Sequence, residues 1–266
     1  MIKKNKKIGQ CFLKDKNIVS KIIDSANINK NDTILEIGLG EGILTKELSK
    51  LSKKVYVIEL DKKLEIYADE ILSNYKNVEI IWDDALKVNL HNLNYNKVVA
   101  NLPYQISSPI TFKLIDRNFD LAVLMYQYEF AKRMVAKENT VEYGRLSVMV
   151  QYFCDVELLF KVPKTVFSPK PKVDSAVVRL TPKKNAYPIK NMDFFKNMVK
   201  AIFQHKNKSI KKGLIHSAHE MNIDREKLKS ILNEIDFNLE QKVFKTPPTE
   251  IYKLANILYD GISNSN

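Results

Sequence analysis

Residues 33–51 read TILEIGLGEGILTKELSKL, and their pattern is the most informative about fold class. The first five residues form a short apolar run, as in a buried strand. Gly38, Gly40 and Gly42 follow, and glycine allows the backbone to approach a ligand without a Cβ in the way. Residues 44–51 then have helical spacing. This order predicts a strand, a ligand-binding turn and a helix, as at the start of a nucleotide-binding α/β domain.

Apolar, β-branched runs recur along the first two thirds of the chain, at residues 55–60, 78–82, 97–100 and 121–125. Amphipathic helical patterns lie between them. Such alternation is typical of an α/β fold, a mostly parallel sheet with helices on both faces and a ligand crevice at the strands' carboxyl ends. Two later strands, 157–162 and 175–180, follow a helical segment at 146–153 and predict an antiparallel hairpin at the sheet edge.

The pattern changes after Thr181, where a polar connection contains Pro182 and Pro188. Strand patterns end there, and from Met192 onward apolar residues recur at helical spacing. We therefore predict two domains, a large α/β domain over residues 1–183 and a small all-helical domain over residues 184–266.

The composition excludes several classes of protein. The chain has 266 residues, 45% of them apolar, but no apolar run near the roughly 20 residues that span a membrane. The basic N-terminus is not followed by a signal-peptide core, so we expect a cytoplasmic protein. Cys11 and Cys154 form no CxxC pair, and His216 and His219 lack a full ligand set, so we expect neither disulfide nor metal site.

The net charge of +12 favours a polyanionic partner. Basic residues gather in two segments, and no acid occurs between Asp193 and Glu220. Such lysines could follow RNA phosphates, although a solvated helix face is the alternative. The candidates are Lys3, Lys4, Lys6 and Lys7 at the N-terminus and Lys206, Lys208, Lys211 and Lys212 in the helical region.

Carboxylates end the next two predicted strands. The glycines read GxGxG, because Ile43 stands where a dinucleotide-binding GxGxxG would have its third glycine, and this disfavours NAD. Glu59 can accept both hydroxyls of a ribose. Asp84 can accept a hydrogen bond from an adenine amine, although a lone acid there is more often a helix cap. Together these residues predict an adenosine-containing cofactor.

The fourth strand runs into Asn101-Leu102-Pro103-Tyr104, which indicates methylation of an amine. The N6 amine of adenine is a poor nucleophile because its lone pair is delocalised into the ring. The Asn101 side-chain oxygen and the Leu102 carbonyl can accept its two hydrogens, while Pro103 fixes the turn. Tyr104 offers a face on which the base can stack. A plain strand-to-loop turn is the alternative.

A second aromatic element is FSPKPKVDS, residues 167–175. Its alternating prolines stiffen the loop, and Phe167 could close over the other face of an extruded base. Lys170 and Lys172 are placed for phosphates. A rigid connector, with Phe167 capping the core, is the alternative.

In these motifs the chain resembles the ribosomal RNA small-subunit adenine dimethyltransferases of the archaeal and eukaryotic-like branch. The family's G-Q-x-F-L appears as Gly9-Gln10-Cys11-Phe12-Leu13, before the glycine turn, the two acids, NLPY and F-x-P-x-P-x-V-x-S. The resemblance implies a Rossmann-like class I methyltransferase domain with a mostly parallel seven-stranded sheet. It implies S-adenosylmethionine as cofactor, bound through Cys11, Leu13, Gly38, Gly40, Glu59, Asp84 and Asn101.

The resemblance also implies the substrate, two adjacent adenosines in the 3′-terminal hairpin loop of small-subunit rRNA. We expect a monomer that acts within a partly assembled subunit and takes part in its biogenesis. Cys11 stands where many relatives have Asn or His, and Asp83 replaces a frequent Gly. Three alternatives remain: methylation of a large-subunit adenosine, a ribosome-assembly factor with incidental catalysis, and a DNA adenine methyltransferase.

Overall fold

A computed structural model of the chain describes residues 11–184 and 186–264. By their contacts these residues form two compact units. The first consists of the chain up to Ala131 and of Cys154–Pro182, and the second of Lys132–Phe153 and the chain from Lys183 onward. The boundary that the sequence predicts, at residue 183, would place residues 132–153 in the first domain. In the structure these residues instead belong to the second unit, where the Tyr152 ring packs against Phe195 with centroids 5.1 Å apart.

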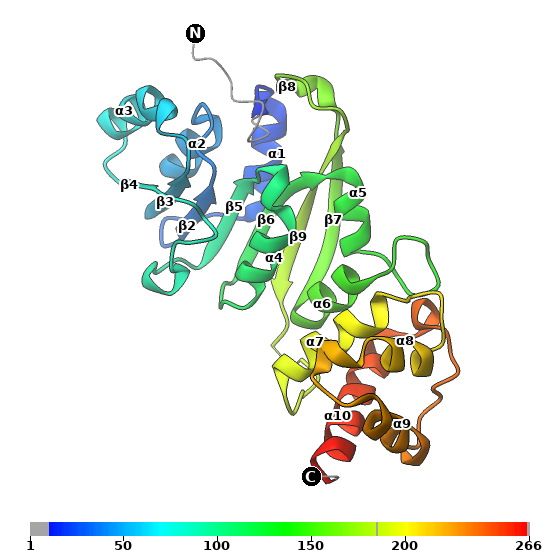
Figure 1. The fold of residues 1–266 in the computed structure, drawn as a ribbon. Coiled ribbons are helices and arrows are strands. Elements are labelled where there is room, and N and C mark those ends of the chain that lie inside the picture. The colour runs from blue at the N-terminus through cyan, green and yellow to red at the C-terminus, as the bar shows by residue number, and fades with distance from the viewer. Residues whose placement is uncertain (1–10, 185, 265–266) are drawn as a thin grey trace. The chain divides into compact units, whose positions relative to one another are not determined.

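A seven-stranded sheet forms the first unit, as Figure 1 shows. The spatial order is β4 (Val78–Trp82), β3 (Lys54–Glu59), β2 (Thr33–Ile37), β5 (Lys97–Asn101), β6 (Leu121–Gln127), β9 (Ser175–Pro182) and β7 (Cys154–Val162). The first five strands in this order are parallel, and β9 is antiparallel to both of its neighbours. The mostly parallel sheet and its antiparallel edge hairpin are thereby confirmed.

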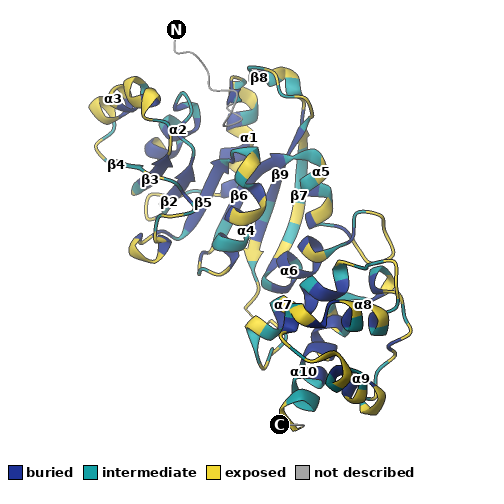
Figure 2. Ribbon diagram, in the orientation of Figure 1, coloured by how far each residue is buried: buried dark blue, intermediate teal, exposed yellow. Residues whose placement is uncertain are grey.

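The sheet is covered on both faces. Helix α2 (Ile43–Leu51) connects β2 to β3, and α4 (Ser107–Ile115) connects β5 to β6. These two connections run along the sheet in opposite directions, and both are expected to be right-handed, so α2 and α4 lie on opposite faces. The strands between them are almost entirely buried (Figure 2). The helices of this region are α1 (Lys16–Ala26), α2 (Ile43–Leu51), α3 (Glu65–Asn74), α4 (Ser107–Ile115) and α5 (Tyr128–Met134).

One small element was missed by the sequence patterns. The two-residue strands β1 (Phe12–Leu13) and β8 (Phe167–Ser168) pair antiparallel, with Leu13 opposite Phe167. Two residues are too few to produce a periodic pattern, and only the fold brings these segments together. The pairing attaches the chain that precedes α1 to the proline-rich loop.

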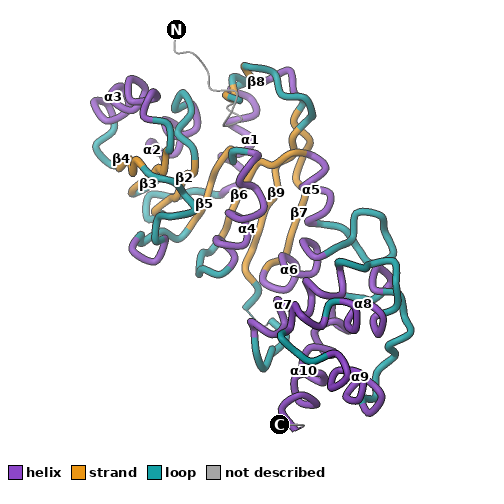
Figure 3. The backbone as a smooth tube through the Cα atoms, viewed as in Figure 1, coloured by secondary structure: helices purple, strands orange, loops and turns teal. Residues whose placement is uncertain are grey.

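The second unit consists of helices (Figure 3), which confirms the helical character of the C-terminal region. Asn191 caps the first helix after Lys183 by accepting the Phe194 N–H, and that helix buries Phe195, Met198 and Ile202 on one face. The helices are α6 (Arg145–Phe153), α7 (Met192–Phe203), α8 (Ile210–His216), α9 (Arg225–Glu234) and α10 (Pro248–Asn264).

Short 3-10 turns complete the described structure: Lys62–Leu64, Leu90–Asn92, Tyr104–Ile106, Lys164–Val166, Ala218–Met221 and Val243–Lys245. No helix among the described residues is both long and apolar enough to cross a membrane.

Candidate active site

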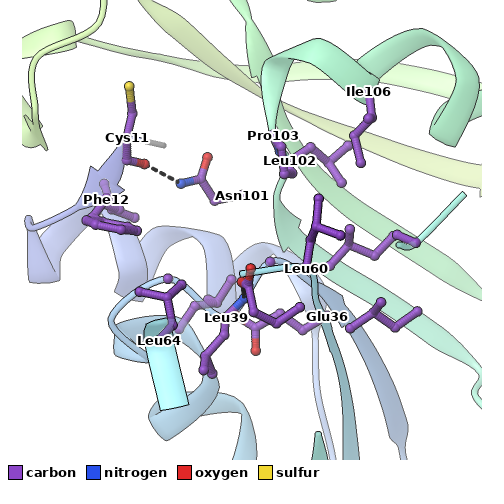
Figure 4. A pocket seen from close by; sticks show the side chains of 18 of the residues that line it. Cys11, Phe12, Glu36, Leu39, Leu60, Leu64, Asn101, Leu102, Pro103 and Ile106 are labelled. Carbon is purple, nitrogen blue, oxygen red and sulfur yellow. Dashed lines mark hydrogen bonds between the residues drawn. The ribbon is translucent and has the colours of Figure 1, made fainter. Parts of the chain in front are cut away.

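A cavity of about 260 Å³ opens at the carboxyl ends of β2, β3, β4 and β5. All residues expected to bind the cofactor line it: Cys11, Leu13, Gly38, Gly40, Glu59, Asp84 and Asn101. Figure 4 shows Cys11 and Phe12 approaching from one side and Leu102 and Pro103 from the other. Parallel strands bring their ends to one edge, which is why segments far apart in sequence meet here.

The turn after β2 requires glycine because of its backbone conformation. Gly38 and Gly40 have φ values of 88° and 57°, in the region that side chains avoid. Both glycines line the cavity, so the backbone of this turn can approach a ligand with no Cβ in the way.

Glu59 is built into this turn. Its Oε2 accepts the Leu39 N–H and its Oε1 accepts the Asp61 N–H, each at 2.8 Å. Burial raises the pKa of Glu59, and these backbone hydrogen bonds oppose that shift. The Gly40 N–H is a third backbone donor to this carboxylate. A carboxylate has about four acceptor positions, so Glu59 retains capacity for a hydroxyl group of a ribose.

Glu36 also lines the cavity, and sequence reasoning gave it no role. Its side chain is buried, burial raises its pKa well above the usual range, and Oε2 has no hydrogen-bond partner among the described residues. Its signal in the sequence was an acid inside an otherwise apolar strand, TILEI. A buried acceptor without a donor fits a ligand that brings its own donor.

Asp84 starts a tight turn whose carbonyl groups converge on one lysine. Asp84 Oδ1 accepts the Leu86 N–H at 2.9 Å, as a cap does. Lys113, from α4, donates to the carbonyls of Ala85, Leu86 and Val88 at 3.0, 2.7 and 2.6 Å. An ammonium has three hydrogens, and this arrangement uses all of them. Lys113 thus holds the turn that carries Asp84 to the cavity.

Replacing Lys113 with methionine is expected to weaken cofactor binding about 10-fold, the equivalent of roughly 1.4 kcal/mol, because the Asp84 turn loses three hydrogen bonds. Calorimetric titration with S-adenosylmethionine measures the change, and kcat at saturating cofactor should stay within about twofold. The matched control is Lys87→Met, which removes an exposed charge from the same turn. Equal losses in the two variants would contradict the positioning role.

Asn101 is the last residue of β5, and its amide is oriented by the start of the chain. Asn101 Nδ2 donates to the carbonyl oxygen of Cys11 at 3.4 Å (Figure 4). None of the described donors bonds to Asn101 Oδ1. Because this contact is made by the Cys11 carbonyl and not by its side chain, it does not require Asn or His at position 11. The arrangement leaves an amide oxygen, an acceptor, at the cavity.

Tyr104 and Leu102 complete the expected motif. The Tyr104 hydroxyl and Ser175 Oγ are 2.7 Å apart, and Ser175 is fully buried at the start of β9. Leu102 N–H donates to the Met125 carbonyl at 3.3 Å, which ties the turn to β6. Ser175 was quoted only as the end of the FSPKPKVDS motif, and its contact with Tyr104 has no local signal in the sequence. The two motifs are therefore joined through one hydroxyl pair.

Phe167 differs from expectation. Sequence reasoning placed its ring over the substrate base, but the ring is buried among core residues that include Phe12 and Val162 and does not line the cavity. Its pairing with Leu13 in the small β1–β8 sheet turns it inward. Phe12, which the family motif contains but to which we assigned no role, lines the cavity instead.

The expected RNA-binding lysines fall into distinct groups. Lys170 and Lys172 are exposed in the proline-rich loop, as are Lys208 and Lys212 in the second unit. Lys206 Nζ donates to the Val141 carbonyl at 2.7 Å. The N-terminal lysines 3, 4, 6 and 7 and the motif residues Gly9 and Gln10 lie outside the described residues. Within the described part of the chain, no three His, Cys, Asp or Glu residues are close enough to hold a metal ion.

The glycine turn, the paired strand-end acids and the NLPY turn at one sheet edge define a Rossmann-like, S-adenosylmethionine-dependent methyltransferase. The cavity fits this cofactor, because the glycine turn, the Glu59 carboxylate and the Glu36 oxygen without a partner among the described residues are suited to a ligand that carries hydroxyl and ammonium donors. A family model described as "Ribosomal RNA adenine dimethylase" matches residues 1–259. The chain belongs to this family and is a methyltransferase.

Similar proteins agree with this assignment. The chain is 60% identical over 99% of both chains to the probable ribosomal RNA small subunit methyltransferase A of Methanococcus maripaludis. The protein of the same name from Pyrococcus abyssi is 46% identical, with 97% of this chain and 93% of that one covered. A solved dimethyladenosine transferase from Plasmodium falciparum has a TM-score of 0.80 and 32% identity, covering 96% of this chain and 98% of that one.

Proposed function

We propose that the enzyme transfers methyl groups from S-adenosylmethionine to the N6 amines of two adjacent adenosines in the 3′-terminal hairpin loop of small-subunit rRNA. The observation that carries the proposal is the Asn101 amide: its nitrogen donates to the Cys11 carbonyl, its oxygen has no partner among the described residues, and Asn101 lines the cavity together with Tyr104. A relative from Methanococcus aeolicus that is 63% identical is named a probable ribosomal RNA small subunit methyltransferase A. In this proposal the enzyme acts in the cytoplasm, as a monomer, on a partly assembled subunit.

The residues at the cavity act mainly by positioning. Asn101 Oδ1 and the Leu102 carbonyl accept the two amine hydrogens and hold the nitrogen lone pair toward the methyl donor. Tyr104, kept in place by Ser175, stacks on the base. When bound, the cofactor would supply a methyl group from a positively charged sulfur. The amine nitrogen held by Asn101 and Leu102 would take that group and lose its proton to water, so a dedicated base is not needed.

A large-subunit adenosine is the second candidate substrate. The solved 23S rRNA methyltransferase ErmE has a TM-score of 0.68 and 27% identity, covering 93% of this chain and 99% of that one. The same fold and site can therefore serve either ribosomal subunit. The higher identity to proteins named for the small subunit favours the small subunit.

A test of substrate and product uses the full-length protein with tritium-labelled S-adenosylmethionine. Unmethylated small subunits, large subunits and duplex DNA are offered in parallel, and the nucleosides are separated by chromatography. We expect N6,N6-dimethyladenosine from small subunits alone. Label in large subunits or in DNA, with none in small subunits, would overturn the proposal.

A further inference from the structure

Two segments of the second unit lie side by side and bring lysines together. The Val243 N–H donates to the Lys208 carbonyl at 3.1 Å, and the Ile210 N–H donates to the Gln241 carbonyl at 3.0 Å. Ser209 and Lys242 form an antiparallel bridge between these hydrogen bonds. The backbone therefore places Lys208 and Lys242, 34 positions apart in sequence, on neighbouring segments.

The helix that follows adds two further basic side chains. Ser209 caps α8, and Lys212 and His216 lie four residues apart on it, so they share one face. Lys208, Lys212, His216 and Lys242, which we call the basic pocket, line a single hollow together with Ser209 and one acid, Glu240. The four basic residues are exposed. A hollow with three ammonium groups and one carboxylate carries net positive charge.

The lysines of the basic pocket differ from most others in the second unit. Many lysines there are neutralised by an acid, as in the pair of Lys200 and Glu220 at 2.6 Å. Lys211 donates to Asn233 Oδ1 at 2.9 Å. Within the described part of the chain, Lys208, Lys212 and Lys242 form neither an ion pair nor a side-chain hydrogen bond. Their ammonium groups are left to water or to a ligand.

The positive charge of the pocket affects the pKa of His216. The Lys208 charge is the main reason that this pKa lies below its usual value, and partial loss of solvent and the charges of His205, Arg225 and Lys212 act in the same direction. The rings of His205 and His216 are 5.3 Å apart. Glu240 is the acid that lines the same hollow. The surrounding positive charges therefore favour the neutral form of His216, and an anion in the pocket would favour its protonation.

We propose that the basic pocket binds a backbone phosphate of the RNA substrate, an inference that rests on the proposed function. Lys208, Lys212 and Lys242 donate to phosphate oxygens, and His216 takes up a proton as the phosphate enters. Such a contact sets the position of the RNA on the second unit and carries no base specificity. It selects two of the four lysines expected from the sequence in this region, Lys208 and Lys212, and adds Lys242 and His216.

The test compares two triple variants that change formal charge equally. Lys208→Gln, Lys212→Gln and Lys242→Gln remove the pocket charges. The control removes three lysines of the same unit that are paired with acids: Lys190→Gln, Lys229→Gln and Lys253→Gln. Binding of a small-subunit rRNA 3′-hairpin fragment is measured by anisotropy from 50 to 200 mM salt, and thermal unfolding checks the fold of each variant.

We expect the pocket variant to bind the RNA at least 10-fold more weakly at 50 mM salt. The slope of the logarithm of the association constant against the logarithm of salt concentration should become shallower by about 2 to 3, near one per lysine. The control should change affinity by less than about threefold, because each of its lysines is already neutralised. Unchanged binding by the pocket variant, or an equal loss in the control, would overturn the proposal.

A second measurement follows the His216 ring by NMR as pH is varied. The pKa of His216 should rise when the hairpin RNA binds, and inorganic phosphate should produce a smaller rise in the same direction. A rise with inorganic phosphate but not with RNA would show a small-anion site and would overturn the RNA assignment. No rise with either probe would overturn the site itself.

The outcome for the pocket and the outcome for the proposed function can be separated. If the wild type methylates small subunits and the pocket variant binds RNA normally, the proposed function is supported and the proposed phosphate site is contradicted. If RNA binding depends on the pocket but no methyl group is transferred to small-subunit RNA, the phosphate site is supported and the proposed function is contradicted.

Discussion

The Asn101→Ala protein is expected to transfer methyl groups at least about 100-fold more slowly than the wild type, because the substrate amine loses one of the two acceptors that position it. Cofactor affinity should fall by no more than about 10-fold, since the change removes one hydrogen bond, from Asn101 Nδ2 to the Cys11 carbonyl. Single-turnover transfer to small subunits and calorimetric titration with S-adenosylmethionine measure the two effects.

Asn101→Asp is the matched control for this prediction. It retains an acceptor oxygen at the same position and loses the donor to Cys11, so it should keep more activity than the alanine variant. Near-normal turnover by Asn101→Ala would contradict the role assigned to the amide. If that variant restored subunit assembly in cells as well as the wild type does, the assembly role would be separate from catalysis.

The second large effect is on stability, at the opposite end of the sheet. Lys97, the first residue of β5, is paired with Asp32 at 2.9 Å, and the two side chains are only 10% and 6% exposed. Asn96 Nδ2 also donates to Asp32, at 2.8 Å. Lys97→Met leaves a buried carboxylate without its cation, and we expect the free energy of unfolding to fall by about 3 to 5 kcal/mol. Urea unfolding at neutral pH measures it.

Lys54→Met is the control, because Lys54 is also the first residue of a strand but its pair with Glu79 is exposed. The control should cost about 0 to 1 kcal/mol. A loss in Lys97→Met no greater than that of the control would contradict the prediction.

The same pair predicts how stability depends on pH. Burial alone would raise the pKa of Asp32, but hydrogen bonds from Asn96 and Lys97 and the Lys97 charge hold it below its usual value. A lowered folded pKa contributes stability above the unfolded value of about 3.9, and this contribution is lost as pH falls through the folded pKa. Urea unfolding between pH 6 and 3 should therefore show a smaller decline in Lys97→Met than in the wild type.

Much of the site was readable from the sequence because its signals are local. The glycine turn needs residues that tolerate positive φ, strand-end acids follow apolar runs, and NLPY is four consecutive residues. In a parallel sheet, strand ends converge by topology, so the order of motifs along the chain was enough to predict that Gly38, Glu59, Asp84 and Asn101 line one cavity.

Other features depended on contacts between distant segments. Phe167 could not be placed from its own surroundings, because its pairing with Leu13 turned it into the core. No pattern within α4 indicated that Lys113 would hold the Asp84 turn, and none within β9 indicated that Ser175 would bond to Tyr104.

The amino-acid sequence alone thus indicated the class of fold, an adenosine-containing cofactor and the candidate reacting turn, since each depends on backbone preferences and residue types within a few positions. The tertiary structure established which side chains support those residues and which lysines remain without a partner. These depend on distances between segments that are tens of residues apart, and such distances are set by packing of the whole unit rather than by any local pattern.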